Sequence, residues 1–371
     1  MLAWLKRYDW VLLLTVLALV GVGEMMIFST TAQIGIAHAG DPFFYVKKHS
    51  LFLLVGLVFM VIGMRIPYHW YQYRMSEIYI FGVVLVFLPL IPALGQEVGG
   101  ATRWIQIAGV QFQPIELSKV AILVALASFI SRKGTQISDW KRGLFPYACI
   151  LFLPLLALFF QPDLGNTILC LAVAGLLLFV SGLKLSRFGL IAAVLTVLIG
   201  ISLITHPYQR ARIQSFLNPW EDPLGKNYHI IQSYTAIGSG GLWGVGIGQS
   251  KYQHFYLPHH YSDFIFSVLC EETGFLGAVF VLALFLMFFV RGIRIVNQAD
   301  NTLAALMAMG VMMFLLGQAL LNIMVVIGLF PITGIPLPFI SYGGSSLMMS
   351  LFLVGILLNI GQEKLPPASE A

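Results

Sequence analysis

A few ionisable side chains stand at the borders of long apolar segments in this sequence of 371 residues. Asp263, in YSDFIF, comes just before an apolar run, and Asp163, in QPDLG, lies in the short turn between two others. Glu116 and Lys119 are three residues apart, so a helix would present them on one face. At membrane depth an ionisable side chain costs about 2.5 to 3.5 kcal/mol, so such residues normally face a cavity or a partner and carry function.

Each of these residues also has a structural interpretation. Ser262 or Asp263 would cap the following helix by satisfying its free N–H groups. Glu116 and Lys119 would neutralise each other, and Asp163 would only shape its turn. Other ionisable groups collect at the same predicted depth, which favours a function. They are Arg103 in GATRWIQ, Arg210 and Arg212 in YQRARIQ, and Glu271 and Glu272, about two turns or roughly 12 Å into the run after Asp263.

Acids and bases that converge from separate segments predict an outward-facing cavity. Such a cavity fits a substrate with anionic phosphates and hydroxyl groups that arrives from the lipid, and it would equally fit a transporter. The three cysteines stand singly in apolar segments, without metal-ligand spacing. They are therefore interpreted as packing residues.

The elements that must position these groups are membrane helices. Only 10% of the residues are charged and 58% are hydrophobic, with a mean hydropathy of +0.87, so we predict an all-α integral membrane protein. The chain is predicted to form one polytopic domain, 1–371, of about ten transmembrane helices. The span 115–131 is the least regular because Glu116 and Lys119 occupy its first turns, so it could be half-buried or lumen-facing. The predicted spans are 10–30, 48–66, 77–95, 115–131, 144–161, 164–182, 187–205, 264–290, 303–328 and 339–361.

The orientation follows from the distribution of Lys and Arg. With both termini cytoplasmic, most basic residues fall in the short cytoplasmic loops, as the positive-inside rule requires. The first span follows Lys6 and Arg7 but is longer than the apolar part of a signal peptide, so we interpret it as retained. The net charge of +5 then reflects topology and phospholipid contact and does not indicate nucleic-acid binding.

The largest segment outside the membrane is predicted to be the extracytoplasmic loop 206–262, between helices seven and eight. It is longer than a structureless connection should be, and its semi-apolar middle, NYHIIQSYTAIGSGGLWGVGIGQ, predicts short interfacial or re-entrant helices. The glycines superficially match a dinucleotide fingerprint, but no strand precedes them, so no nucleotide cofactor is predicted. Glycines with positive φ that shape a tight loop, around a ligand or against another helix, explain the pattern better.

Five stretches between about residues 99 and 347 carry a family resemblance. Together they resemble the hallmarks of the SEDS family, the shape, elongation, division and sporulation glycosyltransferases of the FtsW/RodA type. The resemblance implies an enzyme that polymerises lipid II into a growing glycan strand at the outer face of the bacterial inner membrane. It also implies a class B penicillin-binding protein as partner, among other divisome or elongasome membrane proteins. The stretches are GGATRWIQIAGVQFQPIELSKVA, QPDLGNT, FLNPWEDPLGKNYHIIQSYTAIGSGGLWGVGIGQS, YLPHHYSDFIFSVLCEETGFLG and PITGIPLPFISYGGSSL.

The resemblance also implies roles for single residues. The family's essential aspartate aligns with Asp263, which would take the proton from the 4-OH of the acceptor GlcNAc. The undecaprenyl diphosphate leaving group needs a cation: Lys119, Arg103, Arg210 or Arg212, or a divalent ion, Mg²⁺ or Mn²⁺, with Asp263 and Glu116 as candidate ligands. The supporting or substrate-binding candidates are Glu116, Lys119, Arg103, Asp163, Arg210, Arg212, Gln232 and Ser345.

Some positions depart from the family pattern. Relatives usually carry an acid in place of His259, and a His-Thr pair in place of Tyr261 and Ser262. His259 and His260 could meet diphosphate when protonated. The glycines and serines of PLPFISYGGSS, Ser345 included, are explained more simply by close helix packing than by catalysis.

Three questions stay open at this point. The first question is which member of the family the chain resembles. The division type, with septal wall synthesis, is favoured by the stretches DPFFYVKKHS, GGATRW and NPWEDP. The elongation type, with lateral wall synthesis, is also suited by TGIPLPFISYGGSS. A lipid II flippase would be favoured if the polar path continued to the cytoplasmic side. A divisome scaffold without catalytic activity predicts that Asp263→Ala leaves function intact.

Overall fold

The structure is a computed structural model, and it describes residues 8–98, 101–107, 110–184, 207–223, 225, 227–250 and 261–362, with a few single positions between 187 and 205. Nine helices within these residues match predicted spans one to six and eight to ten. The seventh predicted span, 187–205, lies almost wholly outside the described residues. The nine are α1 (Trp10–Ala39), α2 (Phe44–Arg65), α4 (Met75–Phe87), α5 (Pro114–Lys133), α6 (Phe145–Phe160), α7 (Leu164–Val180), α12 (Ile265–Asn297), α13 (Thr302–Val326) and α14 (Gly344–Ile360).

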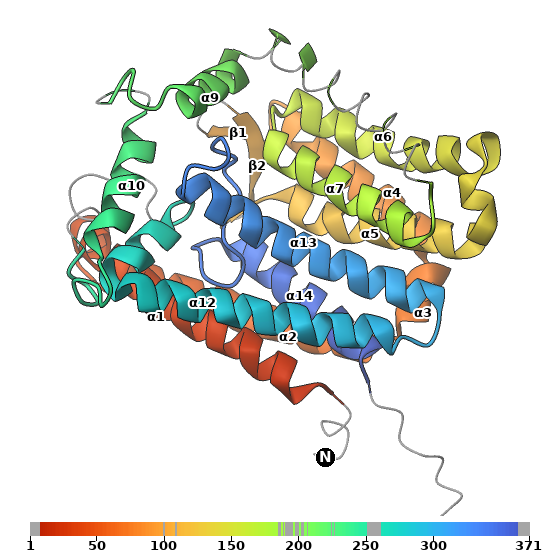
Figure 1. Cartoon of the computed structure of the whole chain (residues 1–371), viewed down its shortest axis with the longest axis horizontal. Coiled ribbons are helices and arrows are strands. Elements are labelled where there is room, and N and C mark those ends of the chain that lie inside the picture. The colour runs from red at the N-terminus through yellow and green to blue at the C-terminus, as the bar shows by residue number, and fades with distance from the viewer. Residues whose placement is uncertain are drawn as a thin grey trace, which may run out of the picture.

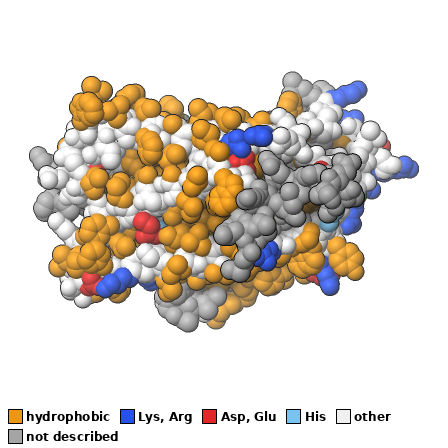
Figure 2. Space-filling view, turned by 90° about the horizontal axis from the view of Figure 1, so that it is seen from below, with side chains coloured by type: hydrophobic (Ala, Val, Ile, Leu, Met, Phe, Trp, Pro, Cys, Tyr) orange, Lys and Arg blue, Asp and Glu red, His pale blue; other side chains and the backbone are white. Residues whose placement is uncertain are grey.

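Six of these helices are long and apolar enough to cross a membrane, judged by length and composition. They are α1, α2, α5, α6, α12 and α13, with the 3₁₀ turn Gly134–Ser138 extending α5 and the π-helical turn Trp140–Leu144 extending α6. The helices α4, extended by the 3₁₀ turn Leu88–Leu90, α7 and α14 are shorter but apolar. Figure 2 shows many hydrophobic side chains spread over one face of the molecule, with Lys and Arg mainly toward one end. A multi-pass membrane protein has this surface.

The helix α5 lies at the centre of the bundle, so the expectation of a half-buried or lumen-facing helix is wrong. Its side chains from Val120 to Ala127 are all buried. Close packing against neighbours explains this position, because Gly82 of α4 leaves no room for a Cβ beside Ala121, and Gly310 of α13 leaves none beside Leu123. Small residues let helix backbones approach closely in membranes.

The two outer layers of the bundle are visible in Figure 1. There α1, α2 and α12 lie below α13 and α14, while α4, α6 and α7 lie above α5. The helices α2 and α14 are in close contact, because Gly63 and Gly355 face each other so closely that a Cβ on either would overlap the backbone of the other helix.

The all-α membrane fold also contains a small antiparallel sheet that the sequence analysis does not predict. The strands β1 (Gly95–Val98), β2 (Ala101–Ile107) and β3 (Val110–Phe112) are ordered β1-β2-β3 between α4 and α5. In β2, Ala101, Arg103 and Ile105 are buried. Side chains alternate between the faces of a strand, so these three lie on one face. The alternating stretch is only 7 residues long, so its signal in the sequence is weak.

In the described part of the predicted extracytoplasmic loop 206–262, the chain forms the helices α9 (Pro207–Leu217) and α10 (Tyr228–Ser239). Another short helix, α3 (Tyr68–Tyr73), links α2 to α4. The eighth predicted span is not one continuous helix, because Gly274 interrupts α12 with φ 66° and ψ −166°. A kink at Gly274 therefore separates the short helical segment 265–273, which follows Asp263, from the long helical segment 275–297.

Candidate functional site

The turn that carries Asp263 is held by three hydrogen bonds from elements distant in sequence. Asn322 Nδ2 of α13 donates to the Asp263 carbonyl at 2.9 Å, and Ser341 Oγ donates to the Ser262 carbonyl at 2.6 Å. The Tyr342 backbone N–H donates to the Tyr261 carbonyl at 2.9 Å. Three successive carbonyls are thus fixed, which preorganises the backbone that bears the carboxylate.

Asp263 is not the N-cap residue of α12. The N-cap position of α12 is Phe264, whose side chain makes no capping hydrogen bond, and Asp263 precedes it. Asp263 is half-buried and lies within electrostatic range of Arg212.

Arg103 and Asp163 form a buried pair near this turn. Arg103 Nε lies 3.7 Å from Asp163 Oδ2, and Arg103 Nη2 donates to the Pro162 carbonyl. Asp163 also caps α7, accepting from the backbone N–H of Asn166 at 3.2 Å and from its Nδ2 at 2.8 Å. Asp163 therefore shapes its turn, as the structural interpretation predicts, and also pairs with a buried arginine.

Arg212 of α9 converges with Arg103 on Gly334, in the segment between α13 and α14. A Cβ at Gly334 would lie 3.4 Å from Arg103 Nη1 and 3.9 Å from both Nη atoms of Arg212. Arg212 Nη1 also donates to the Ile332 carbonyl at 2.9 Å, and its guanidinium lies 4.5 Å from the Tyr208 ring centroid. Two guanidinium groups beside a residue without a side chain suit an anionic ligand.

Burial lowers the pKa of Arg212, and the charge of Arg103 lowers it further, whereas Tyr208, Asp263 and Asp163 raise it. An arginine stays protonated in spite of such a shift. Arg103 and Arg212 repel each other, and an anionic group bound between them would relieve this repulsion.

Glu116 and Lys119 form an ion pair at the first turns of α5, 2.9 Å apart, with side chains only 4% and 1% exposed. The interpretation that they neutralise each other is confirmed. Cys170 of α7 lies within electrostatic range of Lys119, Asp163 and Glu116, so this pair and the Arg103–Asp163 pair occupy neighbouring parts of the bundle.

The other predicted residues lie elsewhere. Arg210, two residues from Arg212 and hence on another side of α9, is exposed and donates to the Ile204 carbonyl at 3.1 Å. Gln232 of α10 is half-buried, and within the described residues no hydrogen bond joins it to Asp263 or the arginines. Ser345 is buried and accepts from the Gln113 backbone N–H at 3.3 Å, a contact that ties α14 to the start of α5. His259 and His260 lie outside the described residues.

The predicted metal ligands are not part of a ready-made metal site in the described part of the chain. No group of three or more His, Cys, Asp or Glu side chains that could hold an ion occurs there. One oxygen of Glu116 already accepts from Lys119 Nζ. Asp263 alone would suit Mg²⁺, which takes one or two protein carboxylates and completes its shell with phosphate oxygens and water.

Sequence reasoning missed two groups beside the Asp263 turn. The first is Asn322, which also donates to the Ile335 carbonyl at 2.9 Å. Its signal in the sequence is a polar amide side chain inside an otherwise apolar run. The second is the pair formed by Glu24 of α1 and His49 of α2, whose Oε1 and Nδ1 are 2.8 Å apart. The His49 ring centroid lies 5.6 Å from that of Tyr342. The signal for this pair in the sequence is the single acid Glu24 inside the first apolar run.

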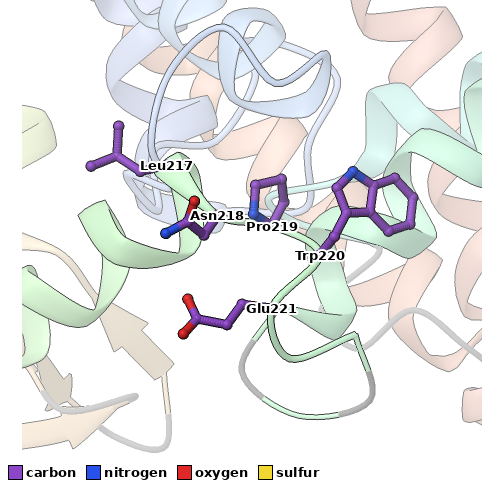
Figure 3. Close-up of a pocket in the computed structure, with 5 residues that line it drawn as sticks. All are labelled: Leu217, Asn218, Pro219, Trp220 and Glu221. Carbon is purple, nitrogen blue, oxygen red and sulfur yellow. The ribbon is translucent and has the colours of Figure 1, made fainter.

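An open hollow of about 410 Å³ follows α9, and Figure 3 shows its lining. It contains neither Asp263 nor the converging arginines. Asn218 and Glu221 point the same way, and Trp220 is turned to the other side. The hollow is lined by Leu217, Asn218, Pro219, Trp220 and Glu221.

Comparisons with known proteins cover nearly the whole chain. A sequence model of the FtsW/RodA/SpoVE family, described as cell cycle protein, matches residues 9–365. Stage V sporulation protein E of Bacillus subtilis (strain 168) is 38% identical over 95% of this chain and 97% of its own length. The probable peptidoglycan glycosyltransferase FtsW of Geobacter sulfurreducens is 39% identical over 96% of this chain and 95% of its own length.

Two solved structures are similar in fold. One comes from work on the structural coordination of polymerization and crosslinking by a peptidoglycan synthase complex, with TM-score 0.78, 30% identity, and coverage of 95% of this chain and 97% of that one. The other is the rod shape determining protein RodA of Thermus thermophilus, with TM-score 0.70, 27% identity, and coverage of 95% and 96%.

Proposed function

This chain belongs to the FtsW, RodA and SpoVE family of cell cycle proteins, and from that premise we propose that it is a peptidoglycan glycosyltransferase with Asp263 as its catalytic carboxylate. The observation that carries the assignment of the site is the Asp263 turn. Its backbone is fixed by Asn322, Ser341 and Tyr342, within electrostatic range of Arg212. A general base must be held in position before it can act, and these contacts supply that.

The substrate is proposed to be lipid II, which is added to a growing glycan strand. The Asp263 carboxylate takes the proton from the acceptor sugar hydroxyl as that oxygen forms the new glycosidic bond. The bond between the donor sugar and the diphosphate breaks, and the diphosphate leaves with the electron pair. Arg103 and Arg212 stabilise its negative charge, and Asp163 orients Arg103 through the buried pair.

A divalent cation, Mg²⁺ or Mn²⁺, fits beside this arrangement with Asp263 as its protein carboxylate. Bound there, it would supply further charge stabilisation to the diphosphate oxygens. Glu116 is assigned instead to the pair with Lys119, which supports the start of α5.

The enzyme is proposed to work at the outer face of the bacterial inner membrane, with both termini cytoplasmic. Several relatives named FtsW support a role in septal synthesis, while the similarity to RodA keeps lateral wall synthesis as the alternative. A class B penicillin-binding protein is the proposed partner, supported by similarity to a protein from a peptidoglycan synthase complex.

A lipid II flippase is the second candidate. It would need a polar path through the bundle, and the observation against it is the central helix α5, which is buried and apolar from Val120 to Ala127. The charged side chains of α5 stand in its first turns, where Glu116 pairs with Lys119.

The decisive experiment measures lipid II polymerisation by the purified chain, alone and with its penicillin-binding partner. Wild type is compared with Asp263→Ala and Asp263→Asn at equal folded amounts. The matched control is Glu221→Gln, which neutralises an exposed acid in the same predicted loop. We expect glycan strands from wild type and the control and none from either Asp263 variant. Polymer from Asp263→Asn would reject the catalytic role, and no polymer from any sample would favour the flippase or the scaffold.

A further inference from the structure

The segment after α10 exposes large apolar side chains that the proposed chemistry does not use. We call residues 241–248 the glycine loop. Within it Leu242 is 64% exposed, Trp243 80%, Val245 41% and Ile247 55%. A contiguous exposed apolar patch of this kind marks an interaction surface.

The glycine loop has a defined backbone. Gly241, Gly244, Gly246 and Gly248 have φ values of 55°, 78°, 105° and 78°, a region that favours glycine. A Cβ on Gly244 would overlap the carbonyl group of Glu272, so only glycine permits this close approach to α12. The expectation of a tight glycine loop packed against another helix is confirmed.

The backbone polar groups of the glycine loop are paired with the break in α12. The N–H groups of Val245 and Gly246 donate to the carbonyls of Glu271 and Glu272, both at 3.0 Å. In return, the N–H of Phe275 donates to the Gly241 carbonyl at 2.9 Å. Irregular backbone can lie at the edge of a membrane when its polar groups are satisfied in this way.

Buried side chains of α12 hold the glycine loop in place by hydrogen bonds on its inner side. Glu272 Oε1 accepts from the Gly248 N–H at 3.0 Å and from Ser29 of α1, and Ser250 donates to Glu271. Both glutamates are 1% exposed. The apolar side chains therefore face outward from a fixed support.

The position of the loop along α12 gives its membrane depth. The piece 275–297 carries Arg291 and Arg294 near its far end, and at about 1.5 Å per residue it can cross a hydrocarbon core of about 30 Å. Phe275, which bonds to the loop, therefore stands at the near boundary of that core. Figure 1 shows α10 and the start of α12 together at one end of the molecule.

We propose that the glycine loop docks on the phospholipid bilayer, with Leu242 and Trp243 inserted at the boundary between headgroups and hydrocarbon. Tryptophan concentrates at this boundary. A lipid occupant is favoured over a protein because the patch continues into exposed residues of α12, among them Phe275 and Phe280, which are 60% and 54% exposed on a membrane-spanning helix. The inference goes beyond the glycosyltransferase assignment and does not depend on it.

The test uses tryptophan fluorescence of the full chain in nanodiscs. The discs contain phospholipid brominated either near the headgroup end of the acyl chains or near their terminal methyl groups. The difference between wild type and Trp243→Phe isolates the emission of Trp243, which is 80% exposed, so the variant should fold. Trp10→Phe serves as a control for a residue at the start of the membrane helix α1.

We expect the Trp243 emission to fall at least about twofold more with shallow bromine than with deep bromine, and to resist aqueous iodide. Emission quenched by iodide and by neither lipid would overturn the proposal. Iodide quenching that disappears only when the penicillin-binding partner is added would also overturn it, by identifying a protein-docking surface. Because no step of the test involves lipid II, its result is independent of the enzymatic assignment.

Discussion

At the scale of single residues, the site depends on groups that fix main-chain carbonyls. Asn322 bridges the Asp263 turn and the segment before α14 with two hydrogen bonds of 2.9 Å. Such an amide is costly to bury in an apolar helix unless it is paired. Asn322 therefore links the free energy of unfolding to the geometry of the Asp263 turn.

Asn322→Leu should lower polymerisation and stability together. The variant leaves the carbonyls of Asp263 and Ile335 without this donor, and we expect unfolding to become easier by about 1 to 3 kcal/mol. The measurements are thermal unfolding in detergent and the initial rate of lipid II polymerisation. Gln318→Leu is the matched control on α13, because Gln318 Nε2 already has no hydrogen-bond partner within the described residues. Equal loss in both variants would contradict a specific role of Asn322.

At the scale of elements, α5 combines the most buried position in the bundle with a charged first turn. Its ion pair is not explained by stability alone, because two buried charges gain little over two apolar side chains of similar size. A functional role explains the pair better, because its charges set the local electrostatic field at the start of the helix, where a charged lipid substrate would be affected by it.

This argument predicts different outcomes for single and double variants. Glu116→Gln or Lys119→Met alone leaves one charge unpaired and should cost about 3 to 5 kcal/mol of unfolding free energy. The double variant should recover most of the stability and remain inactive in polymerisation. The exposed pair Arg74 and Glu77 has the same spacing, and Arg74→Met should change the free energy of unfolding far less than either single variant of the buried pair. A double variant that regains activity would show that the pair is only structural.

At the scale of the whole molecule, the site lies where separate parts of the chain meet. Arg103 comes from the sheet between α4 and α5, Asp163 from the start of α7, and Arg212 from α9. The segment with Gly334 and the Asp263 turn complete the arrangement. All of these elements belong to one end of the bundle, which the proposed orientation places outside the cytoplasm.

Cysteine labelling tests that orientation. In a Cys149→Ser background, Lys47→Cys lies between α1 and the membrane core of α2, and Lys141→Cys lies in the turn before α6. A membrane-impermeant maleimide should label position 47 in intact cells and position 141 only after permeabilisation, because the predicted spans 48–66, 77–95 and 115–131 separate them and the positive-inside rule makes the side of position 141 cytoplasmic. The reverse pattern would invert the topology and place the Asp263 turn in the cytoplasm.

The sequence by itself determined the membrane helices and the candidate charged residues. Hydropathy and length are local properties, so α1, α2 and α13 follow from composition within one segment. The family stretches also pointed to Asp263 before any contact was known. The short sheet and the break at Gly274 escaped prediction, because three strands of few residues and one glycine in an apolar run carry weak local signals.

Only the tertiary structure decided which candidate residues lie together. It joined Arg103 to Asp163 and brought Arg212 to Gly334, and it left Arg210 on another side of α9. It also paired Asn322 with the Asp263 carbonyl across 59 positions of sequence. The physical reason is that apolar periodicity specifies that a helix is buried and not which neighbour it meets. That choice is made by the packing of small residues and by long-range hydrogen bonds.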